Sequence, residues 1–343
     1  MNKVGGAVAV LAVAVLGLSA CGSGEPATDQ SAEAAELVVY SGRSEELVGP
    51  LIEQFEAASG VQAEVRYGDT AELAAQLLEE GDNSPADVFF AQDAGALQVI
   101  EDEGLATALP ADTVKKVPAN FRSADDQWVG TSGRARVIVY NTDLVPAEEV
   151  PDTVFELADP RWKGQVGIAP TNASFQAFVT AMRVTVGEER TKQWLEAMIA
   201  NDVQTFENNL AILDAVNAGT VELGLANHYY LYEKAAEVGA ENLAVRNAAF
   251  ESGDPGNLVN VAGAAVLASG ADNAASEQFV DFLLSDEAQQ YFADETSEYP
   301  LVKGIAARDD LPPLSQIDGP DLTLDQLADL RGTQDLLMQV GLL

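Results

Sequence analysis

The sequence predicts an α/β protein built in two lobes. Short apolar runs of β-rich residues alternate with stretches of helical periodicity along most of the chain, and such alternation favours parallel βαβ units. The length of 343 residues is enough for about two domains, each with its own hydrophobic core.

The first part of the chain supplies these elements in turn. Residues 37–40 form an apolar strand, after which Leu47, Leu51 and Phe55 stand four apart on one helical face. Because a proline late in a helix breaks its hydrogen-bond ladder, we expect this helix to begin near Pro50. There follow a strand at 62–66, a helix whose start is marked by Asp69 and Glu72, and a strand at 87–90.

The same alternation continues to residue 292. The expected strands are 137–140, 165–168, 203–206, 223–226 and 261–267, and the expected helices are 175–186, 192–199 and 277–292. The strand-like segments 132–140 and 260–264 are candidate crossings between the lobes. We therefore expect lobe 1 to comprise 37–134 plus 262–308, and lobe 2 to comprise 135–261 plus 309–343.

The N-terminus is typical of a targeting signal. Residues 1–20 carry one early cation and an apolar run too short for a comfortable membrane span, and they end directly before Cys21. This arrangement indicates a bacterial lipoprotein signal peptide, with Cys21 lipidated and anchoring an extracytoplasmic protein to the membrane. The alternative is an incidental cysteine after an ordinary secretory signal. Residues 21–36 are small and polar and predict a flexible tether.

Composition excludes several classes of function. With one cysteine and one histidine (His228), the chain cannot build zinc fingers, iron–sulfur clusters or Cys–His hydrolase sites. A formal net charge of −37 argues against nucleic-acid binding. The common nucleotide-binding and serine-hydrolase motifs are absent, so we expect a protein that is not an enzyme. We also expect a monomer.

The segment most informative about function is Leu225–Tyr232, with the sequence LANHYYLY. It follows a predicted strand, and ligands of open α/β sheets bind at strand ends. Phenolates are hard oxygen donors suited to a trivalent cation, and a bound cation supplies the help that a phenol needs to ionise at neutral pH. The alternative is that Tyr229, Tyr230 and Tyr232 are aromatic residues packing on a neighbouring helix.

A family resemblance favours the metal interpretation. The chain resembles the periplasmic ferric-iron-binding proteins of ABC importers, also called bacterial transferrins, which have the two-lobe type II periplasmic-binding-protein fold with a hinge and an interlobe cleft. The tyrosine pair in its NHYY setting is the specific match. The other matching segments are 37–60, 84–97, 133–141, 159–178, 256–267 and 298–304.

The resemblance implies that Tyr229 and Tyr230 bind Fe³⁺, but other ligand positions of the family differ. Many members have a histidine after the first strand and a glutamate after ADVF, where this chain has Ser44 and Gln92. Other members use a third tyrosine, where this chain has Asn172. Two protein ligands therefore remain of the three or four found in relatives.

The missing coordination is expected from a synergistic anion, which in this family is carbonate, phosphate or citrate. Hydroxyls, amides and a helix N-terminus after Pro170 suit that role. His228 is interpreted as a structural histidine. The expected anion-binding residues are Asn172 and Ser174 by segment match, Asn209 and Asn227 by distance from the tyrosines, and Arg43 and Arg134, which could instead form salt bridges.

The function implied by the resemblance is capture of ferric iron in the cleft, closure of the lobes, and delivery to an ABC permease and its ATPase. Three alternatives remain open. The same fold could bind a cationic organic solute such as a polyamine through Tyr40, Trp128, Tyr229 and Tyr232. It could bind an anionic solute such as a phosphonate without metal, through Arg43, Arg134 and the asparagine and serine residues named above. It could also serve as the scaffold of an extracellular enzyme.

Overall fold

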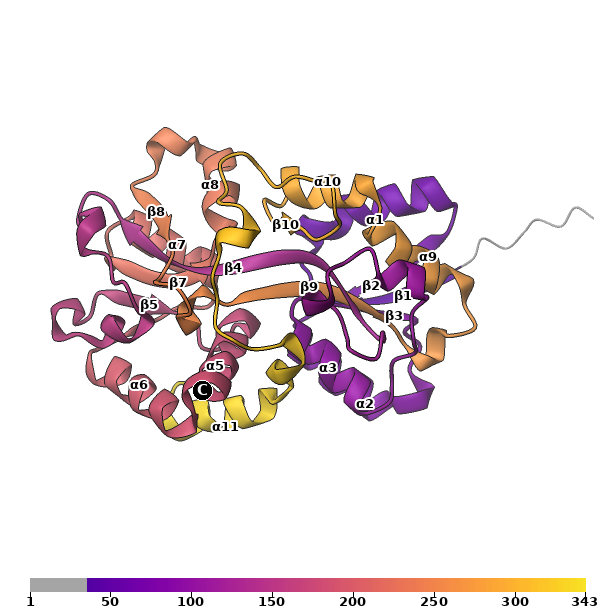
Figure 1. Ribbon diagram of the computed structural model, residues 1–343, viewed down its shortest axis with the longest axis horizontal. Coiled ribbons are helices and arrows are strands. Elements are labelled where there is room, and N and C mark those ends of the chain that lie inside the picture. The colour runs from indigo at the N-terminus through magenta and orange to yellow at the C-terminus, as the bar shows by residue number, and fades with distance from the viewer. Residues whose placement is uncertain (1–35) are drawn as a thin grey trace, which may run out of the picture. The chain divides into compact units, whose positions relative to one another are not determined.

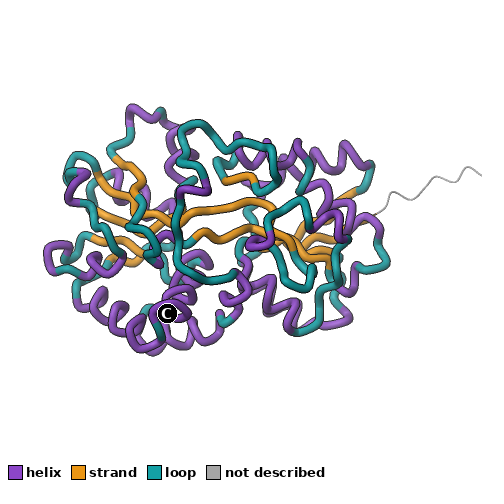
Figure 2. The backbone as a smooth tube through the Cα atoms, viewed as in Figure 1, coloured by secondary structure: helices purple, strands orange, loops and turns teal. Residues whose placement is uncertain are grey.

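The computed structural model describes residues 36–343, so the signal peptide expected at 1–20, Cys21 and all but the last residue of the 21–36 tether lie outside the described residues. Helices and strands alternate along the chain, which confirms the predicted α/β class (Figures 1 and 2). The strands are β1 (Glu36–Ser41), β2 (Gln62–Tyr67), β3 (Val88–Ala91), β4 (Val129–Asn141), β5 (Val166–Ile168), β6 (Gln204–Thr205), β7 (Leu223–Asn227), β8 (Val245–Ala248), β9 (Val259–Val266) and β10 (Tyr299–Pro300). The α-helices are α1 (Glu45–Ser59), α2 (Thr70–Glu80), α3 (Ala94–Asp102), α4 (Ala111–Val114), α5 (Ala173–Val186), α6 (Glu188–Ala200), α7 (Asn209–Asn217), α8 (Tyr230–Val238), α9 (Ala274–Leu283), α10 (Asp286–Asp294) and α11 (Leu330–Val340).

The strands pair in the order β2-β1-β3-β9-β4-β7-β5-β6, with β8 and β10 also pairing with β4. The pairs β1–β2, β1–β3, β5–β6 and β5–β7 are parallel, as the strand–helix alternation predicts. The strands β4 and β9 are antiparallel to their neighbours and run side by side through the middle of the sheet (Figure 1). Two parallel strand groups are thus joined by one antiparallel pair.

Strand β4 pairs with different strands along its length. Val129–Ala135 pairs with β9, and Arg136–Tyr140 pairs with β7. The strand is almost completely buried, and its buried residues include Arg134 and Arg136. Both predicted crossing segments lie in these two central strands, and the assignment of the residues to two lobes at the stated boundaries stays a prediction.

Two predicted helix boundaries are wrong. Helix α1 begins at Glu45 rather than near Pro50, because burial of Val48, Leu51 and Phe55 outweighs the one hydrogen bond that a proline in the second turn removes. The predicted helix 277–292 is two helices, α9 and α10, separated at Leu284 and Ser285. Ser285 starts α10 because its hydroxyl accepts a hydrogen bond from the Ala288 N–H at 3.2 Å.

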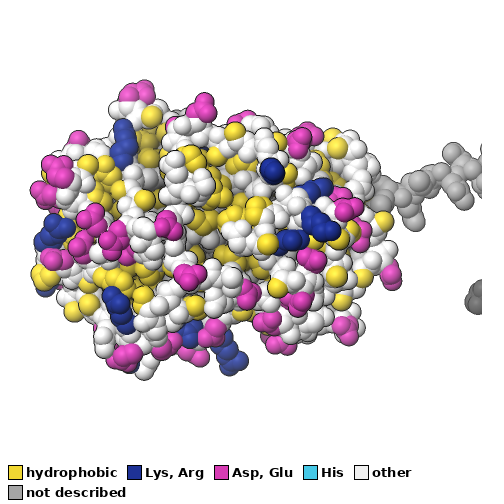
Figure 3. All heavy atoms as spheres, in the orientation of Figure 1, with side chains coloured by type: hydrophobic (Ala, Val, Ile, Leu, Met, Phe, Trp, Pro, Cys, Tyr) yellow, Lys and Arg dark blue, Asp and Glu magenta, His cyan; other side chains and the backbone are white. Residues whose placement is uncertain are grey.

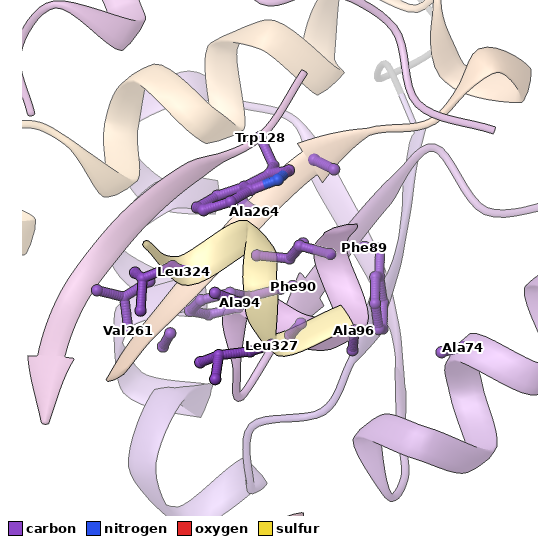
Figure 4. Close-up of a cluster of buried hydrophobic side chains, with 14 of the residues drawn as sticks. Ala74, Phe89, Phe90, Ala94, Ala96, Trp128, Val261, Ala264, Leu324 and Leu327 are labelled. Carbon is purple, nitrogen blue, oxygen red and sulfur yellow. The ribbon is translucent and has the colours of Figure 1, made fainter. Parts of the chain in front are cut away.

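The largest hydrophobic core cluster includes side chains from both ends of the described residues, from Leu37 to Leu337. Trp128 and Phe90 are fully buried, and the indole N–H of Trp128 donates to Gln98 at 3.0 Å. The short 3-10 helix Leu324–Ala328 lies against this cluster (Figure 4). Its approach requires a glycine at position 95, because a Cβ there would lie 2.5 Å from the carbonyl oxygen of Leu327.

The exposed surface carries most of the acidic excess. Figure 3 shows acidic side chains spread over the visible face, with basic side chains fewer among them. Within residues 36–343, no helix has the length and apolar character that a membrane crossing requires.

Candidate functional site

The tyrosine pair lies where β7 ends and α8 begins. Tyr229 has helical backbone angles, and its carbonyl accepts hydrogen bonds from the N–H groups of Tyr232 and Glu233 at 2.9 and 3.0 Å. The two rings stack with centroids 4.2 Å apart and planes inclined by 30°. Tyr229 is 1% exposed, and Tyr230 is partly buried. The structure thus brings together the two predicted metal ligands.

Burial is the main influence on the pKa values of the Tyr229 and Tyr230 phenols. It raises the pKa of Tyr229 well above 10, and the neighbouring Tyr230 adds to that rise. Burial also raises the pKa of Tyr230, while the neighbouring polar groups of Tyr229 and Asn209 act in the opposite direction. The positive charges of Arg43 and Arg134 lower the pKa of Tyr229 in part. Both phenols are consequently protonated at neutral pH until a cation replaces their protons.

Arg43 and Arg134 meet at a buried carboxylate, Glu298. The two terminal nitrogens of Arg43 donate to the two oxygens of Glu298, each at 2.9 Å. Nε of Arg134 lies 3.8 Å from Glu298, beyond hydrogen-bonding distance. Burial acts to raise the pKa of Glu298, but the two guanidinium groups outweigh it and hold that pKa below its usual value. Arg43 thus forms a salt bridge through its two terminal nitrogens, while its Nε has no hydrogen-bond partner among the described residues. A role for Arg43 in binding an anion stays a prediction.

Three of the predicted anion-binding residues form a network with each other. The amide nitrogen of Asn209 donates to Asn172 at 3.1 Å and to the Ser174 hydroxyl at 3.0 Å. Asn172 caps α5 by accepting from the Ser174 N–H, and it also accepts from the Ser174 hydroxyl at 2.6 Å. Arg136, on β4, donates to the Ser174 hydroxyl at 3.1 Å. Asn172 and Ser174 follow the carboxyl-terminal end of β5, and Asn209 follows β6. Arg136 pairs with Asn227 at the carboxyl-terminal end of β7. Strand ends of this kind are where open α/β sheets bind ligands.

Donors without partners surround a small cavity between this network and Arg134. Its lining residues are Arg134, Arg136, Ser174, Asn227, Leu258 and Asn260. In the described part of the chain, Nε and Nη1 of Arg134, Nε of Arg136 and Nδ2 of Asn260 are buried and have no acceptor. Burial lowers the pKa of Arg136 to about 9, so it remains cationic at neutral pH. An acceptor, either water or an anion, would satisfy these donors.

Sequence reasoning missed Arg136, Asn260, Glu298 and Glu233. Arg136 had a usable signal, since it stands two residues after Arg134 and therefore on the same face of a strand. Glu298 had no such signal in the sequence, because its partner Arg43 is 255 residues away.

Glu233 lies in the first turn of α8, directly after the tyrosines. One of its carboxylate oxygens, Oε1, is buried and has no hydrogen-bond partner among the described residues. Burial, with a contribution from Glu298, raises the pKa of Glu233 to about 7, and Arg43 opposes the rise.

His228 is a structural histidine. Its Nδ1 accepts from the Ala135 N–H at 3.2 Å, and its Nε2 lies 2.9 Å from the carbonyl oxygen of Ser297, which requires the proton on Nε2. Both ring nitrogens are therefore used. Burial lowers the pKa of His228 to about 4, so the ring is neutral at pH 7.

Ser44 and Gln92, at two positions where the family resemblance implies metal ligands in other members, have polar side chains without charge. Ser44 is exposed and precedes α1, and Gln92 is partly buried after β3. Of the aromatic residues proposed for an organic cation, Tyr40 and Trp128 are fully buried in the core and bond to Glu80 and Gln98. Those two rings are not available to a solute in the cleft.

Comparisons with known proteins place these features in context. A family model described as bacterial extracellular solute-binding protein matches residues 83–318. The chain is 31% identical over 339 residues to an Fe(3+)-binding periplasmic protein of Serratia marcescens, covering 98% of each chain. Its fold is similar to that of iron-bound HitA from Pseudomonas aeruginosa, with a TM-score of 0.86, 33% identity and coverage of 90% of this chain and 99% of the other. It is also similar to a Trichodesmium protein (IdiA, FutA) in complex with iron and citrate, with a TM-score of 0.76, 29% identity and coverage of 89% and 99%. These similarities confirm the predicted two-lobe binding-protein fold.

Proposed function

Because this chain belongs to the family of bacterial extracellular solute-binding proteins, with ferric-iron-binding proteins among its relatives, we propose that it captures ferric iron outside the cytoplasm for uptake. The metal is bound by the phenolates of Tyr229 and Tyr230. One observation carries this proposal: two buried, stacked phenols lie at a strand end with the charges of Arg43 and Arg134 near enough to lower the pKa of Tyr229. A ferric ion that replaces both phenol protons would form two bonds to hard anionic oxygens.

A synergistic anion completes the site in this proposal. The unpartnered nitrogens of Arg134, Arg136 and Asn260 offer donors that only an acceptor can satisfy. Ser174 and Asn227 line the same cavity, whereas Asn172 and Asn209 support it through their bonds to Ser174. Arg43 contributes its positive charge. Carbonate, phosphate and citrate are the candidates, and carbonate is the smallest of them.

Transport follows from the architecture and the N-terminal sequence. We propose that Cys21 carries the lipid anchor, that the lobes close about β4 and β9 on binding iron, and that the closed monomer delivers its cargo to an ABC permease and its ATPase. The protein would act by stoichiometric binding, without catalytic turnover. Replacing Cys21 with serine should release the protein from the membrane fraction, and retention of that variant in membranes would contradict lipid anchoring.

Visible spectroscopy tests the iron site. Iron-loaded protein should show a phenolate-to-iron charge-transfer band, and Tyr229→Phe or Tyr230→Phe should weaken the band and reduce the affinity measured by competition with a chelator. Tyr232→Phe is the matched control, because Tyr232 lies on the same helix with its hydroxyl bonded to the carbonyl of Asp310 at 3.3 Å. Absence of the band in the unaltered protein, or its persistence unchanged in the Tyr229 variant, would refute the proposal.

Dependence on the anion is tested separately. Iron titrations in buffer freed of carbonate, and then with bicarbonate, phosphate or citrate restored, should show tighter binding and a shifted band with the effective anion. Arg134→Gln should diminish that gain. Equal affinity with and without added anion would contradict the anion site while leaving the tyrosinate site intact.

A further inference from the structure

The side chain of Glu233 is anomalous within α8. Its Oε1 is buried and has no hydrogen-bond partner among residues 36–343. Buried polar atoms without partners are rare in native proteins, and a carboxylate oxygen is a costly group to leave so. The other glutamate of this helix behaves ordinarily, since the exposed Glu237 pairs with Lys234 at 3.1 Å. Glu233 therefore needs a partner that α8 does not supply.

The charged groups facing Glu233 do not supply a hydrogen-bond partner for Oε1 either. Arg43 and Glu298 are the groups whose charges act on it. The two terminal nitrogens of Arg43 are both bound to Glu298, and Glu298 repels a second carboxylate. The third guanidinium nitrogen of Arg43, Nε, is buried and has no hydrogen-bond partner among the described residues, so it does not pair with Oε1 either.

Helical spacing places Glu233 beside the tyrosine pair. Its backbone N–H donates to the carbonyl of Tyr229 at 3.0 Å, so Tyr229 is the residue one full turn earlier. Tyr230 stands three residues before Glu233, and side chains three and four residues apart lie on the same helical face. The negative charge of Glu233 also acts on the phenol of Tyr230. The two tyrosine side chains and the unpartnered carboxylate thus share one face of the first turn.

Such a set of oxygens is what a hard trivalent cation prefers. Two phenolates alone leave most of the coordination sphere of a ferric ion open, and the chain lacks a histidine, glutamate or tyrosine at positions 44, 92 and 172. We propose that Glu233 is a third protein ligand of the ferric ion, binding through Oε1. This inference rests on the proposed iron-binding function and adds a ligand from the tyrosine helix itself.

The test compares Glu233→Gln with Glu237→Gln, each titrated with ferric iron in the presence of a competing chelator. Loss of a ligand should weaken iron binding of the Glu233 variant by about tenfold or more and shift the position of its charge-transfer band, whereas the Glu237 variant should match the unaltered protein. Glu233→Asp keeps a carboxylate on a shorter side chain and should restore part of the affinity. It also serves as the second variant if the glutamine variant folds poorly.

The possible outcomes distinguish ligation by Glu233 from iron binding by the tyrosine pair. Unchanged affinity in Glu233→Gln would overturn Glu233 as a ligand and leave the tyrosinate site standing. Weaker binding with an unshifted band would show that Glu233 acts only through its charge, and would also overturn ligation. A missing band in the unaltered protein would remove the proposed function and this inference together.

Discussion

The pH dependence of stability in the iron-free protein should reveal two opposing groups, His228 and Glu233. The folded-state pKa of His228 is lowered from 6.5 to about 4, so its contribution to stability is present above pH 6.5 and is lost as pH falls toward 4. The folded-state pKa of Glu233 is raised from 4.5 to about 7, so its contribution is present below pH 4.5 and is lost as pH rises through 7. As pH falls from 8 to 5, His228 therefore lowers the free energy of unfolding and Glu233 raises it.

The magnitudes follow from the shifts, at about 1.4 kcal/mol per pKa unit. Moving from pH 8 to pH 5 should lower the free energy of unfolding by about 2 kcal/mol through His228 and raise it by about 2.5 kcal/mol through Glu233. The unaltered protein should therefore show little net change from these two groups. His228→Gln should become more stable on acidification by about 2.5 kcal/mol, and Glu233→Gln should become less stable by about 2 kcal/mol, each relative to its own value at pH 8.

Urea unfolding at a series of pH values, followed by circular dichroism, measures these profiles. The remaining carboxylates are common to all three proteins, so the differences between profiles isolate the two groups. His228 is the only histidine of the chain, and no second imidazole can obscure the comparison. Parallel profiles for the unaltered protein and His228→Gln would refute the reasoning about the buried neutral imidazole.

Three further predictions concern the pair Arg43–Glu298, the phenols and the central strands. Glu298→Ala leaves a buried guanidinium unpaired and should lower the free energy of unfolding by about 3–5 kcal/mol; a loss under about 1 kcal/mol in urea titrations would show that the pair is not a structural requirement. Because the proposed binding of iron by Tyr229 and Tyr230 requires both phenols to lose their protons, iron affinity should rise with pH by about a hundredfold per unit below the phenol pKa values, and a flat profile in competition titrations would contradict binding by two phenolates. Gly263→Ala would place a Cβ 2.7 Å from a carbonyl oxygen of β4 and should cost about 1–3 kcal/mol, seen as a lower Tm; an unchanged Tm would mean that the two central strands separate easily.

Much of the fold was predictable because its signals are local. Alternation of apolar strands with amphipathic helices predicts parallel units, and capping residues such as Asp69 mark helix starts in the structure as they do in the sequence. The errors occurred where tertiary burial overrides a local rule. Pro50 is accommodated inside α1, whereas the apolar spacing of 277–292 continues across the break before Ser285.

The candidate site was predictable only in part. Tyr229 and Tyr230 are adjacent in the sequence and stand out without a structure. The groups that define their surroundings come from distant segments, such as Glu298 with Arg43 and Asn260 with Arg134, and no periodic pattern connects them. A structure is also needed to tell which guanidinium group is hydrogen-bonded to Glu298, since Arg43 and Arg134 look alike in the sequence.

The concentration of guanidinium groups inside so acidic a protein has a consequence for ion selectivity. The outer carboxylates attract calcium, magnesium and sodium as readily as iron, so the exterior discriminates poorly. Near the phenols, the three guanidinium groups of Arg43, Arg134 and Arg136 outnumber the carboxylates of Glu298 and Glu233, and this excess of positive charge should penalise a cation that gains little from phenolate bonding. At the proposed site, an ion that displaces protons from phenol, or arrives with its own counter-charge, would overcome this inner barrier, and the common physiological cations would be rejected at the last few ångströms.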